Sequence, residues 1–175
     1  MDILLQTQSE QYKKNADALI AESGILDILK KYGEPIFVGS YAANLMMNCD
    51  IDIHVLREKP FSKEETLEVL TDFFRRERFN SYYIGDWNGT NIHPEFPDGY
   101  YIGLKIMFAG EKWKIDVWLM SKSEQERIEQ EQFNIAKAVI TQEQRAEILR
   151  LKKENNPKIV PSQKIYEKVL GLPLK

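Results

Sequence analysis

Residues 50–56 alternate between polar and apolar side chains, in the order Asp-Ile-Asp-Ile-His-Val-Leu. A period of two is that of a β-strand, in which successive side chains point to opposite faces of the sheet. Asp50, Asp52 and His54 therefore share one face, and the aliphatic side chains between them share the other. This segment requires a sheet with one apolar face against a core and one polar face that carries two carboxylates.

The other periodicities predict an α+β order of elements. Helical spacing of apolar residues predicts helices over 9–31 with a break at Gly24, 41–47, 62–78, 123–138, 141–153 and 162–170. Apolar or alternating runs predict strands over 35–38, 80–84, 101–109 and 112–120, and residues 85–99 are expected to form a long loop. We therefore predict a small mixed β-sheet flanked by helices, with further helices at the C-terminal end.

Local signals support three of the helix starts and one helix face. Ser62 with Glu65 predicts a capping box, Thr141 is a favourable first residue, and Ser40 is expected to be an N-cap. The apolar face of helix 62–78 is predicted from its large hydrophobic residues, which are Leu67, Leu70, Phe73 and Phe74.

Composition narrows the class of protein. The chain has 175 residues, a net charge of −3 and a pI of about 5.6, and these values lack the broad basic footprint of a nucleic-acid-binding protein. Nucleic acid is therefore not favoured as a partner. Cys49 is the single cysteine, and the chain shows neither a signal peptide nor a membrane span, so a cytoplasmic location is expected.

The polar strand face predicts a metal site. Asp50 and Asp52 are about 7 Å apart along one strand, and two like charges at that separation are unfavourable without a cation. Oxygen ligands suit Mg²⁺, which takes carboxylates together with substrate phosphates. Asp116 lies on the alternating strand 112–120 and shares a face with Lys114 and Trp118. Three acids on one sheet face could hold two metal ions for an in-line displacement at phosphorus.

A phosphate site is predicted beside these acids. Gly39 and Ser40 end one predicted strand and open a helix. Glycine lets a phosphate approach the backbone closely, and a helix N-terminus offers free N–H groups. A triphosphate could then lie between this turn and metal ions held by the acids.

The segment VGSYAANLMMNCDIDIHVL, together with KIDVWLM, resembles the signature of the nucleotidyltransferase superfamily related to DNA polymerase β. The resemblance covers about residues 30–120. It implies two Mg²⁺ ions on Asp50, Asp52 and Asp116, with Asp116 as a third metal ligand or as the base. It also implies triphosphate contacts from Gly39 and Ser40, and transfer of a nucleoside monophosphate from an NTP. Residues 1–122 would form the catalytic domain and residues 123–175 a helical extension packed on it.

The acceptor remains open at this level. The small size and acidic pI are similar to the branch that modifies small molecules, such as the aminoglycoside and lincosamide nucleotidyltransferases. A non-catalytic binding module, as in toxin–antitoxin pairs, and transfer to a protein or RNA acceptor are the alternatives. The C-terminal helices could complete an acceptor cleft or form a dimer.

Several side chains near these motifs have two interpretations. Lys114 could bind phosphate or pair with an acid, and pairing is the better prediction; His54 is expected to be structural rather than a ligand. Trp87, Tyr100, Tyr101 and Trp118 could stack on a base or an acceptor ring, with Trp87 and Tyr100 preferred. Cys49 is expected to be a buried, inert thiol.

Overall fold

The structure is a computed structural model and describes residues 2–89, 96–131, 134–155 and 159–171. It contains a five-stranded mixed sheet in the order β1-β2-β5-β4-β3, in which β2 and β5 are parallel and the other neighbours are antiparallel. The strands are β1 (Glu34–Val38), β2 (Asp50–Arg57), β3 (Ser81–Asp86), β4 (Tyr100–Phe108) and β5 (Glu111–Ser121). The predicted α+β fold with a small mixed sheet is confirmed.

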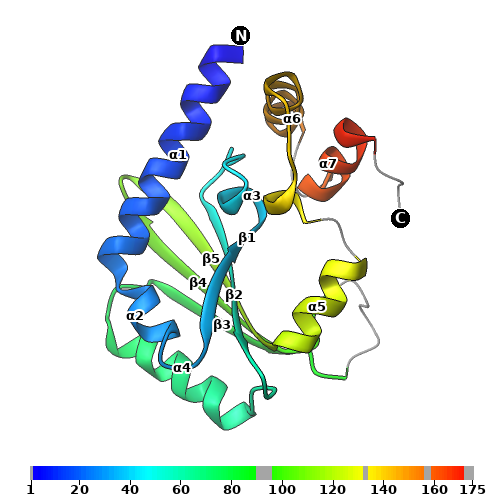
Figure 1. The fold of residues 1–175 in the computed structure, drawn as a ribbon. Coiled ribbons are helices and arrows are strands. Elements are labelled where there is room, and N and C mark those ends of the chain that lie inside the picture. The colour runs from blue at the N-terminus through cyan, green and yellow to red at the C-terminus, as the bar shows by residue number, and fades with distance from the viewer. Residues whose placement is uncertain (1, 90–95, 132–133, 156–158, 172–175) are drawn as a thin grey trace.

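Helices lie on both sides of the sheet (Figure 1). They are α1 (Asp2–Ser23), α2 (Ile25–Leu29), α3 (Gly39–Ala42), α4 (Lys63–Arg75), α5 (Lys122–Glu131), the 3₁₀ helix η1 (Ile135–Lys137), α6 (Gln142–Glu154) and α7 (Ser162–Leu170). Gly24, at φ 68°, separates α1 from α2 as predicted. Within the described part of the chain, no helix is long and apolar enough to span a membrane.

The main core lies on the apolar face of the sheet, against α1, α2 and α4. It contains the aliphatic residues of β2 that alternate with the acids, together with matching residues of β4 and β5. The largest fully buried side chain is that of Trp113 on β5. The period-two pattern of β2 is thus satisfied by burial of one face, and the acids are left on the opposite face.

A second hydrophobic cluster joins the C-terminal helices to the rest of the molecule. Its buried members are Leu5, Leu45, Ile135, Ile148, Leu149, Leu151, Ile165 and Tyr166. Leu5 comes from α1 and Leu45 from the segment between α3 and β2, so α6 and α7 pack on both. This packing holds the C-terminal helices near the sheet face that carries the acids.

The predicted helix over 41–47 is wrong in its bounds. α3 begins at Gly39 and ends at Ala42, and Ser40 is not its N-cap, because Val38 occupies that position without a side-chain hydrogen bond. Asn44 adopts φ 56° and ends the helical path. Leu45 and Met46 follow the end of α3 and are buried in two different clusters.

Two other helix predictions need correction. In α4 the face toward the core carries Thr66, Val69 and Phe73, whereas the predicted Leu67 and Phe74 are 49% and 67% exposed. Thr66 can be buried because its hydroxyl donates to the carbonyl oxygen of Ser62 at 2.8 Å. The predicted helix over 123–138 instead comprises α5 and η1, with Asn134 capping η1.

Candidate metal centre

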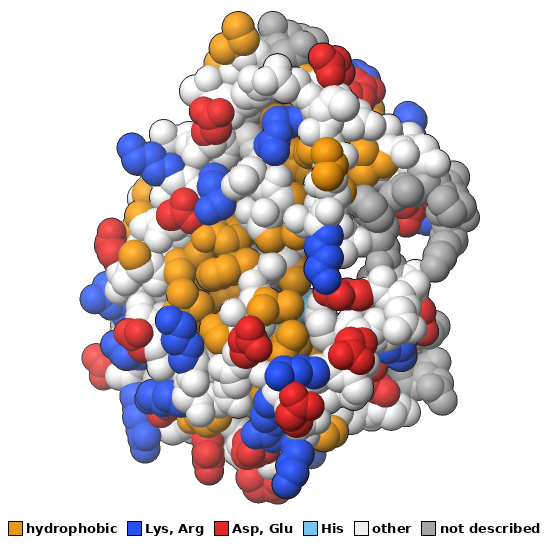
Figure 2. All heavy atoms as spheres, viewed as in Figure 1, with side chains coloured by type: hydrophobic (Ala, Val, Ile, Leu, Met, Phe, Trp, Pro, Cys, Tyr) orange, Lys and Arg blue, Asp and Glu red, His pale blue; other side chains and the backbone are white. Residues whose placement is uncertain are grey.

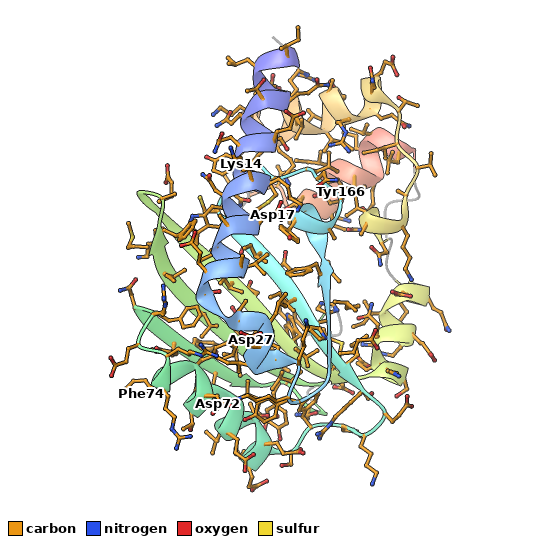
Figure 3. All side chains as sticks on the ribbon, turned by 60° about the vertical axis from the view of Figure 1, so that its left-hand side comes forward. Lys14, Asp17, Asp27, Asp72, Phe74 and Tyr166 are labelled. Atoms are coloured by element: carbon orange, nitrogen blue, oxygen red, sulfur yellow. The ribbon has the colours of Figure 1, made fainter. Side chains whose placement is uncertain are left out.

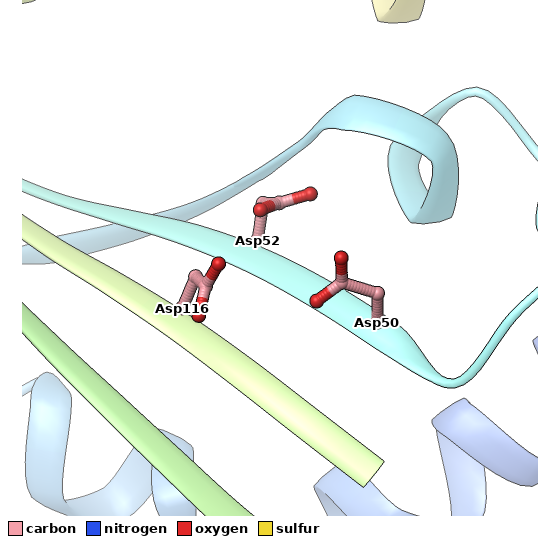
Figure 4. A group of neighbouring side chains, drawn as sticks. All are labelled: Asp50, Asp52 and Asp116. Carbon is pink, nitrogen blue, oxygen red and sulfur yellow. The ribbon is translucent and has the colours of Figure 1, made fainter. Parts of the chain in front are cut away.

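The sheet register brings the three predicted acids together. Asp52 on β2 is the direct partner of Asp116 on β5, and Asp50 is the partner of Lys114. One carboxylate oxygen of each acid lies within 4.8 Å of those of the other two. Figure 4 shows the three carboxylates gathered above the two neighbouring strands.

Burial and mutual repulsion disfavour the charged forms of two of these acids. Burial raises the pKa of Asp52 to about 7, and the charges of Asp50 and Asp116 act in the same direction. Burial also raises the pKa of Asp50, although Lys114 opposes this shift. Clustered carboxylates with raised pKa values are typical of a site that awaits a cation.

The environment of the Asp50 carboxylate is also consistent with a bound cation. Its Oδ1 atom is buried and accepts no hydrogen bond from the described residues, and Nζ of Lys114 lies 4.0 Å from it. A buried oxygen without a donor costs free energy that a bound metal ion would recover. Three carboxylates with oxygen atoms at this spacing have the donor chemistry that Mg²⁺ prefers.

Gly39 lies directly against Asp52. A Cβ atom at residue 39 would lie 2.6 Å from Oδ2 of Asp52, and φ at this residue is 63°. Both facts require glycine here, because other side chains would strain the backbone and displace the carboxylate. The Gly-Ser turn and the acids, separate in sequence, are therefore adjacent in the fold.

Asp116 is held by two neighbours on the same sheet face. Tyr101 donates a hydrogen bond from its hydroxyl to Oδ1 of Asp116 at 2.7 Å, and Lys114 donates to Oδ2. The predicted pairing of Lys114 with an acid is thus confirmed. Together these donors orient the Asp116 carboxylate.

The C-terminal helices add a cation to the site. Nζ of Lys152 on α6 donates to the carbonyl oxygen of Leu45 at 2.8 Å and lies 3.3 Å from the hydroxyl of Tyr166 on α7. Burial lowers the pKa of Lys152 to about 8, while the charges of Asp52 and Asp50 oppose this shift. Sequence reasoning missed Lys152 because a lysine in an amphipathic helix carries no distinguishing pattern.

His54 shares a strand face with Asp50 and Asp52, but its hydrogen-bond partner lies on α5. Its Nδ1 atom lies 2.7 Å from Oε1 of Gln125 on α5, which confirms a structural partner. Burial lowers the pKa of His54, so the ring favours its neutral form. His54 also lines a cavity of about 200 Å³ that reaches Gly39, Glu129, Gln163 and Tyr166.

The aromatic residues predicted to line a pocket lie in two different environments. Tyr100 is buried in the main core, so its predicted role in a pocket is wrong; it follows Gly99 and pairs with Leu119 on the apolar face. Tyr101 and Trp118 share the face of the acids, with ring centroids 5.3 Å apart. Trp87 contacts Trp118 with ring centroids 6.4 Å apart. Residues 90–95 of the predicted loop over 85–99 lie outside the described residues.

Cys49 and a larger hollow lie apart from this chemistry. Cys49 is partly buried against the main core, and burial raises the pKa of its thiol to about 11, as expected for an inert thiol. A hollow of about 520 Å³ between α1 and α6 is lined by Lys13, Asp17 and Arg145 among others. Lys13 pairs with Asp17, and Arg145 donates to the carbonyl oxygen of Asn44. None of the three acids lines this hollow.

Comparisons with known proteins find a likeness to solved structures. No protein-family model and no curated protein sequence matches the chain. Among solved structures, the chain is similar to the Cid1 poly(U) polymerase bound to Mg and 3′-dATP, with a TM-score of 0.56 and 14% sequence identity. The match covers 95% of this chain and 53% of the polymerase, so the chain spans about half of that protein's length. The chain therefore has a nucleotidyltransferase fold.

Proposed function

We propose that this protein is an Mg²⁺-dependent nucleotidyltransferase, which moves a nucleoside monophosphate from an NTP to a hydroxyl group of an acceptor. The observation that carries the proposal is the cluster of Asp50, Asp52 and Asp116 on adjacent strands, with oxygen atoms within 4.8 Å. The direct contact between Gly39 and Asp52 supports it, because it places the Gly-Ser turn beside the acids.

In this proposal Asp50, Asp52 and Asp116 would hold the metal, which would supply positive charge to the triphosphate and to the leaving diphosphate. Gly39 and Ser40 contact the β and γ phosphates. Lys152 adds a positive charge from α6, since its Nζ atom is within electrostatic reach of Asp50 and Asp52. The cavity lined by Gly39 and His54 offers space for the rest of the nucleotide.

The reaction balances as a displacement at the α phosphorus. The acceptor oxygen forms a bond to that phosphorus, and the bond to the oxygen bridging the α and β phosphates breaks. Asp116 is the acid beside β4, on the opposite side of Asp52 from β1. In this proposal Asp116 takes the acceptor's proton while diphosphate leaves.

Two acceptor classes remain candidates. The size and charge of the chain are similar to those of enzymes that modify small molecules. The Cid1 neighbour is a poly(U) polymerase, and this favours a polynucleotide end as the second class. The transfer reaction itself is the same in both cases.

The test combines binding with transfer. We expect each active NTP to raise the melting temperature only with Mg²⁺, and α-³²P-labelled NTP to label an acceptor pool of small molecules, RNA or protein. Asp52→Asn should abolish labelling while the protein stays folded. Wild-type turnover by purified Asp52→Asn would refute the mechanism.

Lys152 provides a second, matched test. Lys152→Met should weaken NTP binding about tenfold, in line with the loss of a buried charge-assisted contact. Lys153→Met removes an exposed lysine at the next position and should leave the affinity unchanged. Equal NTP affinities of the two variants, measured by isothermal titration calorimetry, would remove Lys152 from the nucleotide site.

A further inference from the structure

A group of aromatic side chains continues the sheet face beside Asp116, away from β1. This aromatic shelf consists of Tyr83 on β3, Trp87 after it, Phe96, Tyr101 on β4 and Trp118 on β5. Its rings form a chain of contacts, with centroids 5.6 Å apart for Tyr83–Tyr101 and 5.3 Å for Tyr101–Trp118. Trp118 in turn stacks with Phe96 at 6.1 Å.

Two glycines make room for the shelf. A Cβ atom at Gly103 would lie 2.7 Å from the hydroxyl oxygen of Tyr101, and one at Gly85 would lie 2.7 Å from Nε1 of Trp87. Gly103 is also the register partner of Asp116. Because Gly103 has no side chain, the Tyr101 ring lies over Gly103 on β4. The Tyr101 hydroxyl then reaches the Asp116 carboxylate on β5 at 2.7 Å.

The shelf is open to solvent at both ends of its chain of ring contacts. Tyr83 is 57% exposed and Phe96 is 42% exposed, whereas the main core lies on the other face of the sheet. Large aromatic side chains normally bury most of their surface. The exposed Tyr83 ring contacts Tyr101, whose hydroxyl donates to the candidate site acid Asp116, and this pair of rings indicates a ring-binding surface.

Lysines flank the shelf on the same sheet face. Lys105 follows Tyr101 and Gly103 along β4, and its register partner on β5 is Lys114. Lys105 is exposed. Because Lys114 pairs with Asp116, Lys105 is the lysine of this pair that can contact a ligand phosphate. Aromatic rings beside basic side chains bind single-stranded nucleic acid, through base stacking and phosphate contacts. A local basic side chain is compatible with the overall acidic charge. Figure 2 shows basic and acidic side chains interspersed over the face of the molecule that is in view.

We infer that the aromatic shelf binds the acceptor, and that the acceptor presents a nucleoside end: a planar base next to a free sugar hydroxyl. The inference rests on the proposed transfer reaction. The base stacks on Tyr83 and Tyr101, and the hydroxyl then faces Asp116. The NTP enters from the β1 side and the acceptor from the β3 side, so the acids lie between the two substrates.

The test measures ring binding without catalysis. Tryptophan fluorescence is recorded while adenosine, a ten-nucleotide single-stranded oligoribonucleotide or the non-aromatic amino sugar glucosamine is added, without NTP. We expect adenosine and the oligonucleotide to bind and glucosamine not to. Tyr83→Leu should weaken binding about tenfold, as base–aromatic stacking predicts, and Tyr83→Phe should restore it.

Phe74→Leu is the matched control, because Phe74 is 67% exposed on α4, which packs on the apolar face of the sheet. Figure 3 shows Phe74 at the opposite end of the molecule from Tyr166. This variant should bind the nucleoside and the oligonucleotide like the wild type. Lys105→Gln separates the two sources of a nucleoside end. It should lower the salt dependence of oligonucleotide binding by about one ion and leave adenosine binding unchanged.

The outcomes separate this inference from the proposed function. Unchanged ligand binding in Tyr83→Leu, or binding of glucosamine alone, would overturn the aromatic shelf as an acceptor site. The melting-temperature shift with Mg²⁺ and NTP is measured on the same preparations. A melting-temperature shift with NTP, without binding of adenosine or the oligonucleotide, would support the transfer reaction and refute the shelf as the acceptor site. Binding of adenosine or the oligonucleotide without that shift would refute the transfer reaction.

Discussion

At the scale of single residues, Asp52 lies between Gly39, which directly follows β1, and Asp116 on the neighbouring strand β5. Its carboxylate is buried beside two further acids, so its ionisation opposes folding unless a cation is bound. Gly39 contributes the space that this carboxylate fills. Asp52 is therefore expected to lower stability when it is charged and no cation is bound, whereas glycine at residue 39 relieves the crowding.

The raised pKa of Asp52 predicts a pH dependence of stability. Its pKa is about 7 in the folded protein against an ordinary value of 3.8, so the folded state binds more protons between these values. The stabilisation is full below about pH 4 and is lost as pH rises through 7, by at most about 4 kcal/mol. Urea unfolding in EDTA at pH 5 and pH 8 should show more than half of this loss in the wild type, because the loss begins near pH 4.

Asp52→Asn is the control for that dependence. It should be more stable than the wild type at pH 8 without metal, because the buried charge is absent. Mg²⁺ at pH 8 should stabilise the wild type but not this variant. Identical pH profiles for the two proteins would contradict a raised pKa at Asp52.

Two glycines with positive φ test the contact at Asp52. Gly110 has φ 79°, and no atom of the described residues lies within 4 Å of the position that a Cβ atom would take there. Gly110→Ala should therefore cost about 1 kcal/mol through backbone strain alone. Gly39→Ala adds a clash with Asp52 and should cost at least about 2 kcal/mol. Equal losses of unfolding free energy in the two variants would show that the Asp52 carboxylate moves aside without cost.

At the scale of elements, α6 connects the second hydrophobic cluster to the acids. Ile148, Leu149 and Leu151 are buried in that cluster, and Lys152 turns toward Leu45 and Tyr166. Thr141 and Gln144 close the start of the helix with a capping box. The position of Lys152 thus depends on the packing and the capping of the same helix.

Loss of the α6 cap should be measurable. Thr141→Ala removes the oxygen that accepts from the Gln144 backbone N–H at 3.2 Å, and should cost about 1 kcal/mol. Amide hydrogen exchange should become faster in the first turn of α6. Thr141→Ser keeps a hydroxyl and should retain most of the stability, so an equal loss in both variants would assign the effect to the methyl group.

At the scale of the whole molecule, two hydrophobic clusters hold different elements together. The main cluster folds the sheet with α1, α2 and α4, and the second attaches α6 and α7. The acids lie on the sheet face between these two packings, with Lys152 contributed by the second. Stability of the second cluster should therefore affect nucleotide binding as well as folding.

Truncation of Leu149 tests this coupling. Leu149 is fully buried in the second cluster, so Leu149→Ala should cost about 2–5 kcal/mol in urea unfolding and weaken NTP binding. Val139→Ala, at a residue that is 98% exposed, should change stability by less than about 0.5 kcal/mol. Normal NTP affinity in a folded Leu149→Ala protein would separate the C-terminal helices from the site.

The sequence by itself determined the strands of the site and the faces of their side chains. Alternation in β2 and β5 requires Asp50, Asp52 and Asp116 to face away from the core, because the intervening aliphatic residues must be buried. The break at Gly24 and the capping box at Ser62 also follow from local chemistry. These features depend on residues close together in the chain.

Only the tertiary structure decided which strands are neighbours and what surrounds the acids. The parallel pairing of β2 with β5 sets Asp52 beside Asp116, although 63 other residues separate them in the chain. Packing of α6 brings in Lys152, and strand pairing turns Tyr101 toward Asp116 while it buries Tyr100. Such contacts arise from long-range burial and register, which no local period in the sequence encodes.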